Sequence, residues 1–467
     1  MFKYYIYINY MRRYTKKRKT IKGRNKRSRH RYRHTRNKRG GALDESAKNV
    51  VAKSIQNKSQ ALTNILQTYC SNPDNCLTLG HYGDYIKQFF DNFRNLSYVD
   101  NNALKRIGNT SANGLILQLP FKKDGYTAYT ALKCSVNQTS DNLFYEYYVG
   151  KYFVNTYIKK FPLFLETYDC YEFYNVNMWQ QLINFCNNKS FPPNFNIQNF
   201  VRRVNVDEND MSMFEESCVK NKLFCILIQY FDKFYDFEKK FLKEYDSIKY
   251  DIFNLLYQIY FVLCSLNDKY THYDLHSGNV FLYKPYDGYK CILMRYHRNN
   301  VVYEFKSEYI VKVIDYGRNF FDNGKVKSGD IIHNYICGKP KCEPDCGYDY
   351  GYASIASNTQ NPEDFYWINP EVPNRSHDIR MFVKDYMEDF FYDNLKIKIQ
   401  YDEDYGTPED MTDIPKTFNN IFSVRKFLES YIPAYNLDKN KKKYGNWTVA
   451  ATMDIYDDGR EYDFKVV

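Results

Sequence analysis

The chain has 467 residues, of which 18% are aromatic and 26% are charged, and its formal net charge is +11. With only 20 Gly and 14 Pro, this composition excludes a mainly disordered or fibrous chain and allows one large core with extensions. Twelve scattered cysteines, no recognisable secretory leader and no run of ~18 uncharged apolar residues predict a protein that is not secreted, has mostly unpaired thiols and does not span a membrane.

The first 40 residues differ in charge from the remainder of the chain. They hold 17 Lys or Arg and no Asp or Glu, which leaves 49 basic against 55 acidic residues, a formal charge of −6, for the rest. We interpret residues 1–41 as a disordered basic arm, because such a segment has nothing with which to build a core. Residues 11–40 could contact nucleic acid, direct the protein to the nucleus or lie beside another polyanion, and the alternative is a solubilising tail.

Residues 42–102 form a predicted helical N-terminal extension. Apolar residues recur at helical spacing from Val50 to Leu66, and HYGDYIKQFFDNFRNL gives a second helical pattern. We expect this extension to pack on the domain, and its residues carry no evident chemistry.

A β-rich segment follows from about residue 103. Gly108 and Gly114 flank small polar residues and precede an alternating strand, LILQL, so this segment could be a loop over nucleotide phosphates, which needs glycines, or a plain hairpin. The next predicted strand, YTAYTALKCSV, contains Lys133. A predicted helix, DNLFYEYYVGKYFV, then places Glu146 thirteen residues after that lysine.

The middle of the chain alternates between irregular and strongly apolar segments. We interpret residues 160–222 as an insertion, and KLFCILIQYF at 222–231 as a buried strand. Apolar residues at three-to-four spacing between Phe253 and Leu266 predict a long helix.

Two polar motifs follow that helix. THYDLHSGNV at 271–280 places Asp274 and Asn279 on a short loop between apolar runs, and VKVIDYG places Asp315 after a β-branched run and just before Gly317, which permits a sharp turn. This is the arrangement for phosphoryl transfer from a magnesium nucleotide. Asp274 would orient or deprotonate the attacking hydroxyl, and Asn279 with Asp315 would hold Mg²⁺.

The remaining segments add two hairpins and a cysteine cluster. KCILMRY with VVYEF, between the two polar motifs, and TVAATMDIYDDGREYDFKVV at the end are predicted hairpins. A zinc site and free thiols in a loop remain alternatives for the cluster His333, Cys337, Cys342 and Cys346, which lacks a C-x₂-C knuckle.

The order and wording of these motifs resemble the protein-kinase-like superfamily, and HYDLH with IDYGR is similar to kinase-like proteins of large nucleocytoplasmic DNA viruses. The resemblance covers about residues 103–390. It implies an α+β, two-lobed fold, with a small β-rich N-lobe at 103–230, which includes the insertion, and a larger, mainly helical C-lobe at 231–467, which ends in the C-terminal hairpin.

The resemblance also implies roles for individual residues, with ATP and Mg²⁺ as cofactors. Lys133 would hold the α- and β-phosphates, Glu146 would orient Lys133, and Asp274 would be the catalytic base. Asp378, at a predicted helix start, is similar to the buried aspartate that anchors the catalytic loop. The implied nucleotide-binding residues are Lys133, Gly108, Gly114, Gln229 and Tyr230.

Two departures from the family pattern bear on the function. Tyr273 stands where the family has an arginine that binds an activation-loop phosphate, and His276 stands where serine/threonine kinases have a lysine. The acceptor, a protein hydroxyl or a small molecule, therefore stays open. We expect an ATP- and Mg²⁺-dependent phosphotransferase, a serine/threonine-type protein kinase of a large DNA virus, in the host cytoplasm, the virion or the nucleus. The alternative is a pseudokinase or virion scaffold whose basic arm binds nucleic acid.

Overall fold

The computed structural model describes much of the chain from residue 60 onward. The described residues are 60, 63–64, 73–79, 83–111, 114–135, 143–188, 190–214, 222–332, 335, 371–384, 387–400 and 413–467. The predicted basic arm at 1–41, most of the first helical pattern of the extension, and the cysteine cluster with His333 lie outside these residues.

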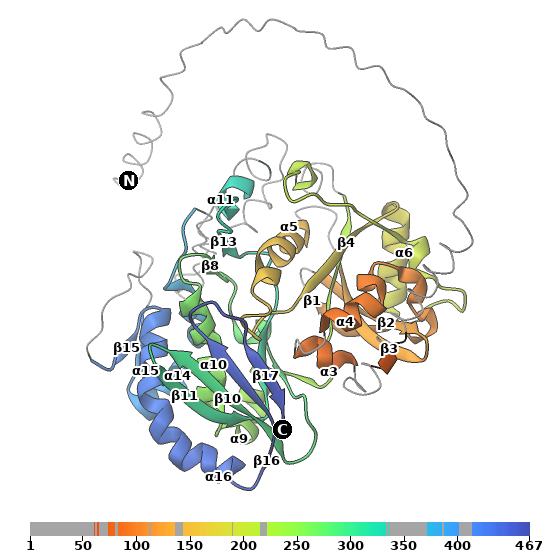
Figure 1. Cartoon of the computed structure of the whole chain (residues 1–467). Helices are drawn as coiled ribbons and strands as arrows, with labels where there is room; N and C mark the ends of the chain where they lie inside the picture. The colour runs from red at the N-terminus through yellow and green to blue at the C-terminus, as the bar shows by residue number, and fades with distance from the viewer. Residues whose placement is uncertain are drawn as a thin grey trace, which may run out of the picture. The chain divides into compact units, whose positions relative to one another are not determined.

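A six-stranded sheet in which every neighbouring pair is antiparallel occupies the first half of the described chain (Figure 1). Its spatial order is β1-β2-β3-β6-β4-β5. The strands are β1 (Lys105–Ser111), β2 (Gly114–Lys123), β3 (Tyr126–Cys134), β4 (Thr167–Phe173), β5 (Val201–Arg203) and β6 (Phe224–Gln229). The interval 160–222, which we interpreted as an insertion, therefore supplies two strands of this sheet.

The sheet separates two hydrophobic clusters, because alternate side chains of a strand point to opposite faces. In β6, Cys225 and Leu227 belong to one cluster, together with side chains of the helices α4 (Gly83–Phe89) and α6 (Val176–Asn187). Ile226, between them, belongs to the other.

The second cluster includes the helix α5 (Leu143–Tyr148), which continues into a π-helical turn, η4 (Val149–Phe153). A Cβ atom at Gly150 in this turn would lie 2.1 Å from the Thr167 hydroxyl oxygen. Only glycine therefore allows the helix to approach β4 this closely.

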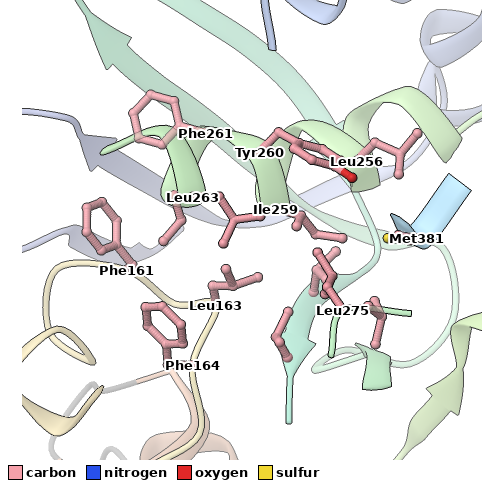
Figure 2. Packing of buried hydrophobic residues seen from close by; sticks show 14 of the residues in the cluster. Phe161, Leu163, Phe164, Leu256, Ile259, Tyr260, Phe261, Leu263, Leu275 and Met381 are labelled. Carbon is pink, nitrogen blue, oxygen red and sulfur yellow. The ribbon is translucent and has the colours of Figure 1, made fainter. Parts of the chain in front are cut away.

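The helix α10 (Ile252–Ser265) lies in the centre of the second cluster. Every residue from Ile252 to Cys264 is buried, so the helix is surrounded by the core on all sides. The helix α15 (Ile421–Tyr435) packs along it through aromatic contacts. Figure 2 shows Leu275, which follows the predicted catalytic aspartate, in the same cluster as Ile259 of α10 and Met381.

The two predicted hairpins both form, and they join in one four-stranded sheet of order β11-β10-β16-β17 (Figure 1). The turn of the first hairpin is Asn299-Asn300, with φ angles of 47° and 63°. This left-handed pair is typical of a tight hairpin turn. The strands are β10 (Lys290–Arg298), β11 (Val301–Ser307), β16 (Thr448–Tyr456) and β17 (Asp463–Val466), and β10 pairs with β16 in parallel.

Smaller elements complete the described chain. A three-stranded sheet has the order β12-β9-β7, and two-stranded sheets pair β13 with β8 and β14 with β15. Their strands are β7 (Phe234–Asp236), β8 (Tyr270–Thr271), β9 (Val280–Tyr283), β12 (Ile310–Val313), β13 (Phe320–Phe321), β14 (Lys398–Ile399) and β15 (Thr417–Phe418). The remaining α-helices are α3 (Pro73–Thr78), α8 (Phe237–Lys243), α9 (Tyr245–Ile248), α11 (Ser328–Ile331), α13 (Arg380–Lys384), α14 (Met387–Leu395) and α16 (Lys441–Tyr444).

The fold is thus of the α+β class, with antiparallel sheets and separate helices. Within the part of the chain that the structure describes, no helix has the length and apolarity needed to cross a membrane.

Candidate active site

Three charged side chains from three different segments meet beside the main sheet. Nζ of Lys133, on β3, lies 2.6 Å from Oε2 of Glu146 on α5 and 3.3 Å from Oδ1 of Asp315, which follows β12. Lys133 is 6% exposed and Glu146 is 3% exposed. The lysine therefore joins the sheet, the helix and the segment after β12 at one buried point.

Mutual attraction keeps Lys133 and Asp315 charged in this buried place. Burial alone would lower the pKa of Lys133, but the nearby carboxylates of Asp315 and Glu146 outweigh it and raise the pKa above its ordinary value. Burial alone would likewise raise the pKa of Asp315, but Lys133 outweighs it and lowers the pKa. Removing one partner of such a buried pair leaves the other charge buried without its partner, which lowers the stability of the fold by roughly 3–5 kcal/mol.

The loop that carries Asp274 is fixed from behind by Asp378, in the short helix η10 (His377–Ile379). The backbone N–H of His272 donates to Oδ2 of Asp378 at 2.8 Å, and the N–H of Tyr273 donates to Oδ1 at 3.0 Å. The predicted anchoring by Asp378 is confirmed. Tyr273 has a left-handed φ of 60°, a conformation that costs a non-glycine residue roughly 1–2 kcal/mol.

The His272 ring links this loop to the segment that carries Asp315. Its Nδ1 accepts a hydrogen bond from the backbone N–H of Asp274 at 3.2 Å, and its Nε2 donates to the carbonyl oxygen of Ile314 at 2.9 Å. These partners assign the ring proton to Nε2. One imidazole thereby fixes the distance between the two polar motifs.

Asp274 and Asn279 lie at the two ends of a short turn. Leu275 is buried in the core while Asp274 is partly exposed, so the loop directs its carboxylate away from the core. Nδ2 of Asn279 donates to the Asp274 carbonyl oxygen at 2.9 Å, which leaves Oδ1 as the oxygen that could meet a cation. The carbonyl oxygen of Asn279 accepts from the N–H of Ile314 at 3.1 Å, so Asn279, directly before β9, lies beside the segment after β12 that carries Asp315.

The chain turns at Asp315 itself. Asp315 has a φ of 69°, so the left-handed residue lies two positions before Gly317, where we expected the turn. The hydroxyl of the buried Tyr316 accepts from the N–H of Leu165 at 2.8 Å and lies 3.1 Å from the Val313 carbonyl oxygen. These contacts hold the residue next to Asp315, and a strained backbone persists only where its surroundings fix it.

The predicted nucleotide-binding glycines lie on neighbouring strands. Gly108 is in β1 with a φ of 67°, at an irregularity in the β1–β2 register, and Gly114 is the first residue of β2. Residues 112–113, between the two strands, lie outside the described residues. The left-handed backbone explains why glycine occupies position 108.

The two predicted base-contacting residues have different surroundings. The backbone N–H of Gln229 donates to the Glu166 carbonyl oxygen at 2.8 Å, and its side chain donates to the Leu77 carbonyl oxygen at 2.9 Å. That N–H is therefore already used within the fold. Tyr230 is half-buried, with its ring 6.0 Å from the ring of Tyr129 on β3.

Three buried residues around the site were missed by sequence reasoning: Tyr145, Tyr316 and Asn319. Each forms hydrogen bonds to backbone groups far away in the sequence. Nothing in their spacing distinguishes them in a chain with 49 tyrosines, so no sequence signal could have found them.

No family model and no curated protein matches this chain. Among solved structures it aligns with WaaP in complex with acyl carrier protein, at 8% sequence identity, over 66% of this chain and 90% of that chain, with a TM-score of 0.25. An alignment with a TM-score this low says nothing further about this chain.

Proposed function

We propose that this protein is an ATP- and Mg²⁺-dependent phosphotransferase with a two-lobed, protein-kinase-like fold, its N-lobe at 103–230 and its C-lobe at 231–467. The observation that carries the proposal is the position of Lys133 between Glu146 and Asp315. A buried lysine that holds one carboxylate from a helix and another beside an Asp/Asn loop has the geometry required to bind nucleotide phosphates.

The donor set of the site fits a magnesium ion. Mg²⁺ prefers oxygen ligands, and the Asn279 amide and the Asp315 carboxylate supply them from positions just before β9 and just after its neighbour β12. These two residues would hold the ion, which when bound supplies positive charge to the phosphates. The fully charged state of Asp315, favoured by Lys133, suits this role.

The remaining residues would act on the two substrates. Lys133 would bind the phosphates of ATP, and Glu146 would keep its ammonium group in place. Asp274, partly exposed on a loop fixed by His272 and Asp378, would orient the acceptor hydroxyl and accept its proton. Gly108 and Gly114 would let the backbone approach the phosphates, and the strand end at Gln229 and Tyr230 would face the base.

Our proposal for the acceptor rests on the resemblance of the motifs alone. On that basis we propose a serine/threonine-type protein kinase of a large DNA virus. His276 accepts a hydrogen bond from the N–H of Gly278 at 3.1 Å, so Nδ1 of its ring is already occupied. An assay that offers both protein and small-molecule acceptors would show whether the protein phosphorylates a small molecule instead.

Substitution of Asp274 tests the mechanism. Asp274→Asn should lower phosphate transfer from radiolabelled ATP by about 10²–10⁴-fold, the usual contribution of a general base, with little change in ATP affinity. Asp246→Asn is the matched control, because Asp246 is a surface residue whose side chain is 90% exposed. Equal transfer by wild type and the Asp274 variant would refute the assigned role.

Nucleotide binding is tested separately by thermal denaturation with ATP and Mg²⁺. A ligand at 100 times its Kd adds about 2.7 kcal/mol of stability, which raises the melting temperature measurably. No shift at millimolar ATP and Mg²⁺ would favour the alternative, a pseudokinase scaffold.

A further inference from the structure

A continuous set of buried hydrogen bonds joins the Glu146 helix to the catalytic loop, and Asn319 lies at its centre. Asn319 is 1% exposed. Its Nδ2 donates to the His272 carbonyl oxygen at 2.6 Å, and its Oδ1 accepts from the Tyr270 hydroxyl at 3.0 Å. Its own carbonyl oxygen accepts from the Tyr145 hydroxyl at 2.7 Å. One residue thus contacts the loop, the strand before it and the helix α5.

Tyr145 connects this set to the ion pair, since it directly precedes Glu146 in α5. It is 1% exposed, and burial raises the pKa of its hydroxyl, which also bonds to Ser328. The hydroxyl therefore stays protonated and donates. Because α5 has only six residues and continues into a π-helical turn, its own backbone hydrogen bonds fix its position weakly.

We propose that Tyr145 and Asn319 are positioning residues, which hold α5 and the catalytic loop in the one arrangement that brings Glu146 to Lys133. This inference rests on the proposed phosphotransferase function. Both residues are buried, and the contacts described above are all to protein groups. Loss of the Tyr145 hydroxyl would increase the population of a state in which Glu146 is withdrawn from Lys133.

A matched control separates positioning from simple loss of a buried hydrogen bond. Tyr148 lies on the same helix, and its hydroxyl donates to the Glu208 carbonyl oxygen at 2.9 Å. Tyr148→Phe removes this bond, and Tyr145→Phe removes the bonds of its hydroxyl to Asn319 and Ser328. Loss of one such bond changes an equilibrium about fivefold. Of these bonds, the one to Asn319 leads to the catalytic loop.

The first experiment measures kcat and KM for ATP in the full-length variants Tyr145→Phe, Tyr148→Phe, Glu146→Gln and the double variant Tyr145→Phe/Glu146→Gln. We expect Tyr145→Phe to lower kcat/KM about fivefold, and Tyr148→Phe to leave it near the wild-type value. In the Glu146→Gln background the Tyr145 substitution should add no further loss, since residues that act through one another are not additive. Equal effects of the two tyrosine substitutions, or multiplication of losses in the double variant, would overturn the proposal.

A second readout is independent of phosphate transfer. Acetylation of Lys133 by an amine-reactive ester, followed by peptide mass spectrometry, reports how often its ammonium group is released from Glu146. Tyr145→Phe should raise the acetylation rate of Lys133 about fivefold relative to other lysines, while Tyr148→Phe should not. If the protein transfers no phosphate but Lys133 shows this difference, the proposed function fails and the positioning role stands. If neither variant changes the acetylation of Lys133, the positioning role fails.

Discussion

Lys312 is a buried lysine whose charge opposes folding. It lies on β12, is 2% exposed, and among the described residues its Nζ donates to the carbonyl oxygens of Phe164 at 3.3 Å and Thr78 at 3.5 Å. No carboxylate of the described residues forms an ion pair with it. Burial lowers the pKa of Lys312 from 10.5 to about 7.

The sign of the resulting pH dependence follows from linkage. The unfolded chain holds this proton up to its ordinary pKa of 10.5, whereas the folded chain releases it above about pH 7. Folding therefore releases a proton between these values, and the stability of the protein rises with pH across this window. At 1.36 kcal/mol per pKa unit, the buried charge of Lys312 lowers the free energy of unfolding by about 5 kcal/mol below pH 7. This cost disappears above pH 10.5.

Lys312→Met removes the titrating group and keeps an unbranched side chain. The lysine lowers the free energy of unfolding by about 4 kcal/mol at pH 7.5 and by about 1 kcal/mol at pH 9.5. The stability advantage of the variant over wild type should therefore be about 2–3 kcal/mol smaller at pH 9.5 than at pH 7.5. Urea denaturation of both proteins at the two pH values measures this. Lys290→Met, at an exposed strand position, is the control and should show no such change. A stability difference between Lys312→Met and wild type that is the same at both pH values would refute the reasoning.

Three further outcomes are expected. Tyr316→Phe should lower the free energy of unfolding by about 1–3 kcal/mol in urea denaturation, because the buried N–H of Leu165 loses its acceptor; an unchanged value would contradict this. Asp378→Asn should lower kcat while far-ultraviolet circular dichroism stays unchanged. The amide oxygen can accept from one of the N–H groups of His272 and Tyr273, but the amide NH₂ group then faces the other N–H, donor against donor. Wild-type kcat would show that the loop does not need this anchor. Removal of residues 1–41 should abolish any salt-sensitive retention on DNA or RNA, measured by filter binding at 50 and 200 mM salt, and unchanged retention would dismiss a nucleic-acid role for the arm.

The spacing of apolar residues and the turn residues correctly predicted several helices and strands. The strands at β2, β3 and β6, the helix α10 and both hairpins were predicted from the spacing of apolar residues and from turn residues. The pairing of β10 with β16 could not be predicted, because each hairpin satisfies the same alternation whether or not it has another neighbour. The strands β4 and β5, within 160–222, were missed for a related reason. Asn-rich turns interrupt their apolar residues, and it is the pairing of β4 with β6, and of β5 with β4, that makes them strands.

The candidate site was partly accessible to the same reasoning. The order and spacing of the motifs, together with the resemblance that they carry, identified Lys133, Glu146 and Asp315, which the structure brings together. Their assigned roles remain predictions. The left-handed backbone at Asp315 was misplaced at Gly317, since the sequence favours glycine there and only the fixed neighbours hold an aspartate in that conformation.

The parallel pairing of β10 with β16 also orders events during synthesis. β10 is complete at Arg298, but its partner begins only at Thr448, roughly 150 residues later. At about 5–20 residues per second, a ribosome needs about 8–30 s to cover that distance. During this time the β10–β11 hairpin has an unpaired strand edge, which is a template for pairing with other chains. The length of this exposure is therefore set by the speed of translation and not by the stability of the finished fold.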